Sequence, residues 1–133
     1  MPSLYKRAFA FFAILWIVQK KVVPLQIVMN EHKIINDPVF GFIKIRRGLL
    51  YDIVQHPLFQ RLNRIVQLGL ASVVYPGARH TRFQHSLGAL HLMSEAVKSL
   101  TEKGIYIFDS EAEAVQAAIL MHDIGHGPFS HVL

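Results

Sequence analysis

The chain has 133 residues, of which 52% are hydrophobic, and its formal net charge is +5. This length allows one domain at most, and the high apolar content indicates helix faces that these residues alone would leave uncovered. Because the sequence has no cysteine, disulfide bonds and thiolate metal ligands are excluded, which is typical of the reducing cytoplasm, where we expect the protein to be located.

The positive charge permits two interpretations. A basic surface attracts nucleotides or nucleic acid. However, the lysines and arginines are scattered along the sequence and form no long basic run. An ordinary solvated surface therefore explains them as well as a nucleic-acid-binding face does.

The N-terminal segment has some features of a targeting sequence. Lys6 and Arg7 precede an unbroken apolar run over residues 8–18, as in a signal peptide, but no small-residue cleavage site follows. Polar residues end the run before the roughly 20 residues that a membrane span needs. We interpret residues 1–28 as a spurious upstream extension and residues 29–133 as the domain. A short membrane anchor is the alternative, although we expect no firm membrane association.

The middle of the chain contains the signals of supporting structure, namely turn residues, a proline that suits the start of a helix, and β-branched residues. We expect a strand over residues 39–45 after an Asp37-Pro38 turn, a helix that starts at Pro57 and buries Leu58, Leu62 and Ile65, and a β-branched segment over residues 71–75 that ends at a Pro76-Gly77 turn.

Two longer helices follow. The first is predicted over residues 83–103, and the second from Ser110, the N-cap of a capping box with Glu113, to about residue 124. Small residues in the first helix would let the second approach closely. The predicted inward faces are His85, Gly88, Ala89, Leu92 and Ala96 in the first helix, and Val115, Ala118, Ile119 and His122 in the second.

His122 and Asp123 are adjacent, so their side chains point about 100° apart on a helix. They can share one ion only beside the helix end, in a seam with another helix, and we expect His85 to face His122 there. A single histidine on an apolar face is more often a hydrogen-bonded core residue than a ligand. The combination of two histidines with a carboxylate favours a metal, because an unpaired buried Asp123 would be costly. Such a mixed nitrogen and oxygen set suits a divalent transition metal: iron, manganese, nickel or zinc.

Several blocks of the sequence resemble those of one enzyme superfamily. They are Ile35-Asn-Asp-Pro38, Phe59-Gln-Arg-Leu62, Gln67-Leu-Gly69, Tyr75-Pro-Gly-Ala78, His80-Thr-Arg-Phe-Gln-His85-Ser-Leu-Gly88 and His122-Asp-Ile-Gly-His-Gly-Pro-Phe-Ser-His131. In this order they resemble the HD-superfamily phosphohydrolases, and most of all the deoxynucleoside triphosphate triphosphohydrolases, including the SAM- and HD-domain-containing enzymes. The resemblance implies a mostly α-helical HD-domain bundle with a minor β element, truncated at its C-terminus.

The resemblance also implies residue roles and a reaction. The expected reaction is hydrolysis of a deoxynucleoside triphosphate to nucleoside and inorganic triphosphate, with magnesium accompanying the nucleotide and the full-length protein forming a homo-oligomer. A further aspartate ligand is expected downstream of Leu133, so we expect residues 1–133 alone to be inactive. The implied roles are metal ligands for His85, His122 and Asp123, catalysis for His126 and His131, and substrate binding for Arg82, Gln67 and Leu68.

Two other functions remain open. A cyclic-nucleotide or guanosine-alarmone phosphodiesterase of the same superfamily would use a similar site, although such enzymes more often have lysine in place of His126. A non-catalytic nucleotide-binding module is the second alternative, because the expected downstream ligand is absent from these residues. The remaining basic side chains are predicted to lie on the surface, namely Arg61, Arg64, His32, His56 and His91, while His80 has no assignment.

Overall fold

The computed structural model describes residues 31–130, so the interpretation of residues 1–28 and the role of His131 lie outside the described residues. Residues 33–133 form one compact unit. The described elements are β1 (His32–Asp37), β2 (Gly41–Arg46), α2 (Leu49–Gln55), α3 (Pro57–Gln60), the 3-10 helices η1 (Arg61–Arg64) and η2 (Gly69–Val73), α4 (Arg82–Glu102) and α5 (Asp109–Met121). This composition confirms the predicted mostly helical fold with a minor β element.

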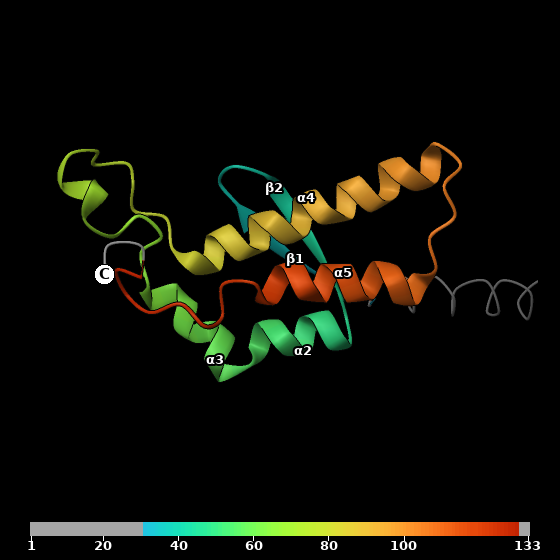
Figure 1. Ribbon diagram of the computed structural model, residues 1–133, viewed down its shortest axis with the longest axis horizontal. Coiled ribbons are helices and arrows are strands. Elements are labelled where there is room, and N and C mark those ends of the chain that lie inside the picture. Colours follow the sequence, from blue (N-terminus) through green and yellow to red (C-terminus); the bar gives the residue numbers. More distant parts are fainter. Residues whose placement is uncertain (1–30, 131–133) are drawn as a thin grey trace, which may run out of the picture. The chain divides into compact units, whose positions relative to one another are not determined.

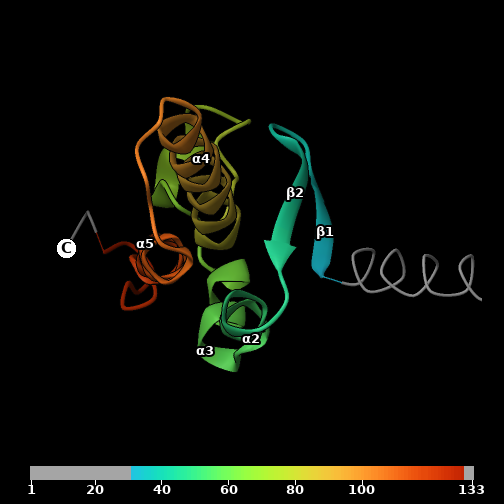
Figure 2. The same cartoon turned by 90° about the vertical axis from the view of Figure 1, so that its right-hand side faces the viewer.

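Helices α4 and α5 run antiparallel and make the most extensive contact between elements (Figure 1). Helix α2 packs on α5, and β2 packs on α2 and α4. In the view of Figure 2 the hairpin lies to the right of α4, whereas α5 lies below α4 and to its left. Among residues 31–130, no helix is both long and apolar enough to cross a membrane. The core that these elements enclose consists of Ile43, Ile45, Leu50, Val54, Phe59, Leu62, Ile65, Leu87, Leu90, Ala117 and Leu120.

The predicted single strand over residues 39–45 is wrong at its start, because the chain forms a hairpin there. Asp37 Oδ1 accepts hydrogen bonds from the backbone nitrogens of Val39, at 2.8 Å, and Phe40, at 3.0 Å. These bonds make residues 38–40 a turn, and Gly41 follows it with a φ of 71°. The predicted Asp37-Pro38 turn is therefore present, but it connects two strands, and the second of them begins at Gly41 rather than at Val39.

Pro57 is the first residue of a helix, as predicted, but the α-helical part ends at Gln60 and continues as the 3-10 helix η1. Phe59, Leu62 and Ile65 are the buried residues, whereas Leu58 is 58% exposed. Their spacing of three residues matches a 3-10 helix, in which every third side chain lies on one side. The β-branched segment over residues 71–75 is also helical in its first part, which belongs to η2.

Helix α4 lies within one residue of its predicted bounds at both ends. Its inward face is different, because Ser86, Leu87 and Leu90 are buried while His85 is exposed. Gly88 also does not provide the close approach to α5 that was predicted. A Cβ atom at that position would lie 2.7 Å from a ring carbon of Phe40, so the small residue accommodates the hairpin.

The N-cap of α5 is Phe108, two residues before the predicted Ser110, and the helix ends at Met121 rather than near residue 124. The Glu111 carboxylate, and not the predicted Glu113, accepts the capping hydrogen bond, which comes from the Phe108 backbone nitrogen at 3.0 Å. Its buried residues are Ala117 and Leu120, while Val115 is 41% exposed. The helix has apolar residues on most of its sides, so the periodicity of the sequence alone did not identify the side that packs.

Thr81 caps α4 and supplies the first stability prediction. Its Oγ1 accepts from the Gln84 backbone nitrogen at 3.3 Å, and Gln84 Oε1 accepts from the Thr81 nitrogen at 2.9 Å. Thr81→Ala should lower the free energy of unfolding by about 1 kcal/mol, because it removes one half of this capping box. Urea denaturation of the variant measures this loss. Thr101→Ala, near the exposed end of α4, is the control and should change stability less.

Candidate metal centre

Two histidines meet where the first turn of α4 lies beside the end of α5. His85 belongs to α4, and His122 is the residue directly after α5. Their Nε2 atoms are 3.1 Å apart, and the ring planes make an angle of 63°. The prediction that His85 faces His122 is therefore confirmed, although both predicted inward faces are wrong. The side chains meet at the edge of the α4–α5 seam and not inside it.

Asp123 completes a group of three potential ligands. The ligand atoms of His85, His122 and Asp123 all lie within 4.8 Å of one another. Asp123 is 5% exposed, while both histidines are exposed, so the carboxylate forms the floor of the site and the imidazoles form its rim. Asp123 Oδ1 is 3.5 Å from His122 Nε2.

A backbone contact determines which nitrogen of His122 can bind a cation. Its Nδ1 lies 2.6 Å from the carbonyl oxygen of Ile119. A carbonyl only accepts hydrogen bonds, so Nδ1 carries the proton and the lone pair of the neutral ring is on Nε2. Nε2 is also the atom that faces His85. This backbone partner therefore orients the ring, as hydrogen-bonded neighbours commonly do for metal-binding histidines.

The protonation states of the three groups suit a metal. Burial lowers the pKa of His85, and the charges of His122, His80 and Arg82 add to this effect, which outweighs the opposite effect of Asp123. Burial acts to raise the pKa of Asp123, but the Arg82 hydrogen bond and the nearby positive charges more than compensate, so this pKa is lowered. At neutral pH the site thus offers a neutral imidazole at His85 and an ionised carboxylate, the forms in which these residues bind metals. Two nitrogens and one oxygen match the preference of divalent transition metals, so these residues fit such an ion.

Arg82, the predicted phosphate ligand, is buried under the site and 1% exposed. Its NH1 donates to Asp123 Oδ2 at 2.7 Å, and its NH2 donates to Ser130 Oγ at 2.8 Å. A phosphate group therefore has no access to the two terminal nitrogens in this structure. The role of Arg82 as a substrate ligand stays a prediction.

The other predicted site residues lie at different distances from the three ligands. His126 is close, with its Nε2 3.7 Å from Asp123 Oδ1. Gln67 pairs with the strand-like segment before α4 through its backbone nitrogen, which donates to the His80 carbonyl at 3.0 Å. Its Oε1 is buried without a hydrogen-bond partner in the described part of the chain. Leu68 is 51% exposed.

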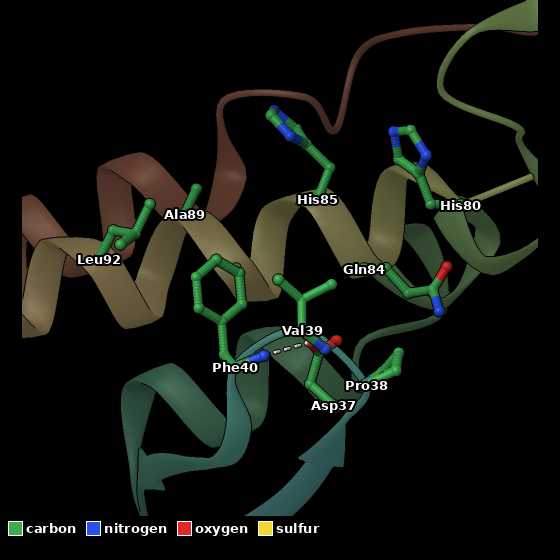
Figure 3. A pocket seen from close by; sticks show the side chains of 10 residues that line it. Asp37, Pro38, Val39, Phe40, His80, Gln84, His85, Ala89 and Leu92 are labelled. Carbon is green, nitrogen blue, oxygen red and sulfur yellow. Dashed lines mark hydrogen bonds between the residues drawn. The ribbon is translucent and has the colours of Figure 1, made fainter. Parts of the chain in front are cut away.

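A pocket of about 380 Å³ opens next to His85, between α4 and the hairpin turn (Figure 3). Val39 and Phe40 point from the turn toward α4, and His80, which had no assignment, lies on the same side as His85. The lining is mainly apolar. Its polar side chains are those of Asp37, Gln84 and the two histidines. The complete lining consists of Asp37, Pro38, Val39, Phe40, His80, Gln84, His85, Gly88, Ala89 and Leu92.

Arg61, which is expected from the sequence to be a solvated helix charge, also contacts the segment after α5. Its NH2 donates to the carbonyl oxygens of Ile124, at 2.8 Å, and His126, at 3.0 Å. Both carbonyls belong to the segment after α5, so Arg61 holds the segment that carries His126 to η1. The two partners are more than 60 residues apart in the sequence, so no local pattern could have indicated the contact.

The part of the chain that contains the three potential ligands matches a known protein family. Residues 82–133, which include all three potential ligands, match the HD domain family. The chain is 45% identical over 115 residues to the bovine (Bos taurus) deoxynucleoside triphosphate triphosphohydrolase SAMHD1, a match that covers 85% of this chain and 19% of that protein. It is 42% identical over 103 residues to an uncharacterized protein of Bacillus subtilis, covering 77% of this chain and 24% of the relative.

A solved structure shares the same arrangement. The crystal structure of a phosphohydrolase from Bacteroides thetaiotaomicron superposes with a TM-score of 0.76 at 80% sequence identity, over 77% of this chain and 26% of that one. The chain thus spans about a quarter or less of the length of these three relatives.

Proposed function

We propose that this chain, whose residues 82–133 belong to the HD domain family, supplies the metal centre of a phosphohydrolase that cleaves deoxynucleoside triphosphates into nucleoside and inorganic triphosphate. The observation that carries the proposal is the convergence of His85, His122 and Asp123 within 4.8 Å at the end of α5. The substrate is inferred from the relatives named SAMHD1, which are deoxynucleoside triphosphate triphosphohydrolases and are about 45% identical to this chain.

In this proposal His85 and His122 bind a divalent metal through imidazole nitrogens, and Asp123 binds it through a carboxylate oxygen. HD domains bind divalent metals, and the donor set suits iron, manganese, nickel or zinc. A metal of this kind acts as a Lewis acid that activates water and polarises phosphoryl oxygens. The absence of thiolates in the sequence leaves the imidazoles and the carboxylate to hold it.

The surrounding residues would handle the substrate. His126, at the edge of the site, can donate a proton to the oxygen that leaves phosphorus when the nucleoside departs. His131 is proposed to serve the phosphates or the leaving group as well. Gln67 and Leu68 are proposed to line the nucleotide pocket, and the unpartnered buried Oε1 of Gln67 within residues 31–130 is consistent with a ligand contact.

The reaction class is tested by product analysis with the full-length protein. Each deoxynucleoside triphosphate should yield inorganic triphosphate and nucleoside, while a cyclic dinucleotide and a guanosine alarmone should remain intact. His126→Gln should lower kcat more than it weakens nucleotide binding, because a proton donor acts mainly in the transition state. Cleavage of only the cyclic dinucleotide or the alarmone would instead identify a phosphodiesterase. Metal binding with no cleavage at all would indicate a nucleotide-binding module.

A further inference from the structure

We propose that Arg61 is a positioning residue, which holds His126 beside the metal centre so that its imidazole can donate a proton to the leaving group. The inference rests on the proposed function, in which His126 is the proton donor. Loss of the Arg61 side chain should slow turnover without weakening metal binding, because its guanidinium bonds the segment after α5 rather than the three potential ligands.

The position of Arg61 in the fold gives its side chain a fixed base. Arg61 is the first residue of η1, and its neighbours Phe59 and Leu62 are both 0% exposed. These neighbours belong to the core, so the backbone that carries Arg61 is held on both sides. The Arg61 side chain is exposed, and its NH2 donates to the carbonyls of Ile124 at 2.8 Å and His126 at 3.0 Å. A single nitrogen therefore joins η1 to two carbonyls of the segment after α5.

The segment that carries His126 belongs to no helix or strand. Ile124 packs against the core, but His126 is separated from it by Gly125, and glycine restricts the backbone least of all residues. The His126 nitrogen donates to the Asp123 carbonyl at 3.0 Å, which forms a local turn without attaching it to another element. Because Arg61 bonds the Ile124 and His126 carbonyls together, it restrains the backbone on both sides of Gly125.

The restraint determines where the His126 imidazole lies. Its Nε2 is 3.7 Å from Asp123 Oδ1, the same oxygen that lies 3.5 Å from His122 Nε2. A proton donor must be placed closely against the reacting oxygen, and a displacement of about 1 Å can lower a rate by about 100-fold. Metal binding depends less on this segment, because His85 and His122 are placed by α4 and by the end of α5.

Steady-state kinetics of the full-length protein with Mn²⁺ tests the inference. Release of inorganic triphosphate is measured for each of the four deoxynucleoside triphosphates, and the fastest substrate is used for the variants. Arg61→Gln should lower kcat by about 10- to 100-fold and leave KM and the Mn²⁺ content unchanged. The matched control is Arg64→Gln. Arg64 is an exposed arginine of the same 3-10 helix whose side chain makes no hydrogen bond within residues 31–130, so kcat should not change.

A double variant shows whether Arg61 acts through His126. In protein that carries His126→Gln, the added Arg61→Gln should cause no further loss of kcat, because the side chain that Arg61 positions is already absent. An additive loss in the double variant would overturn the positioning role. An unchanged kcat in folded Arg61→Gln, or a loss of Mn²⁺ that matches the loss of kcat, would overturn it as well. If circular dichroism shows that Arg61→Gln misfolds, Arg61→Lys replaces it and should show a smaller loss of kcat with the same dependence on His126.

The NMR signal of the His126 ring separates a failure of this inference from a failure of the proposed function. In metal-free protein, Arg61→Gln should shift or broaden the signal of the His126 Cε1 proton, whereas Arg64→Gln should not. A changed signal in a protein that releases no triphosphate would refute the proposed reaction but support the attachment of His126 by Arg61. An unchanged signal in a protein that does release triphosphate would refute the positioning role and leave the reaction standing.

Discussion

Full-length protein carrying His122→Ala should retain almost no bound transition metal, with an affinity lower by on the order of 100-fold or more. This loss exceeds the roughly 10- to 100-fold effect of removing a group that only orients a metal ligand. The reason is geometric. His122 Nε2 is the atom that lies near both His85 and Asp123, at 3.1 Å and 3.5 Å, and the Ile119 carbonyl directs its lone pair there. No other described ring occupies the same place between these two groups. Elemental analysis of the purified variant gives the metal content per chain.

A matched histidine controls for the loss of an imidazole. His56 is exposed and caps α3, where its Nδ1 accepts from the Leu58 nitrogen at 3.3 Å. His56→Asn preserves a capping side chain, so metal content and stability should both stay close to those of the unaltered protein. Equal metal content in His122→Ala and the unaltered protein would contradict the assignment of His122 as a ligand.

The sequence predicted that His85, His122 and Asp123 lie close together more successfully than it predicted the helix faces around them. The pair His122-Asp123 must lie at a helix end for both side chains to reach one ion, and that constraint does not depend on which face packs. The choice of face depends on the partner elements instead. In α5, the pair Ala117 and Leu120 is buried, whereas the pair Val115 and Ala118 is exposed. The residues of each pair are three positions apart, so helical spacing does not distinguish the two pairs.

The contacts that charged residues make with partners far away in the sequence could not be predicted from the sequence. Arg82 is expected from the sequence to bind phosphate, because the sequence does not show whether an arginine is exposed or buried. Its burial follows from two partners that the antiparallel arrangement of α4 and α5 brings to it, Asp123 and Ser130. Arg61 likewise acts on the segment after α5 only in the folded chain. Such roles depend on tertiary structure and have no periodic or local signal.

Leu120→Ala should lower the free energy of unfolding by about 2–5 kcal/mol, the largest loss of stability among the proposed substitutions. Leu120 is 0% exposed and belongs to the core, and its helix α5 packs against both α4 and α2. Its truncation removes apolar contacts and leaves a cavity, because the surrounding elements can close only in part around the lost isopropyl group. Chemical denaturation monitored by circular dichroism measures the loss.

The same substitution should also weaken metal binding, because His122 lies two residues beyond Leu120 and takes its position from this end of α5. Leu92→Ala is the matched control. Leu92 lies in the middle of α4 but is 58% exposed, so its truncation should change stability by about 0.5 kcal/mol or less. Equal effects of the two leucine substitutions would contradict the packing of α5 described above. A large loss of both stability and metal affinity at Leu120 alone would instead show that the packing of α5 supports the site, because His122 directly follows this helix.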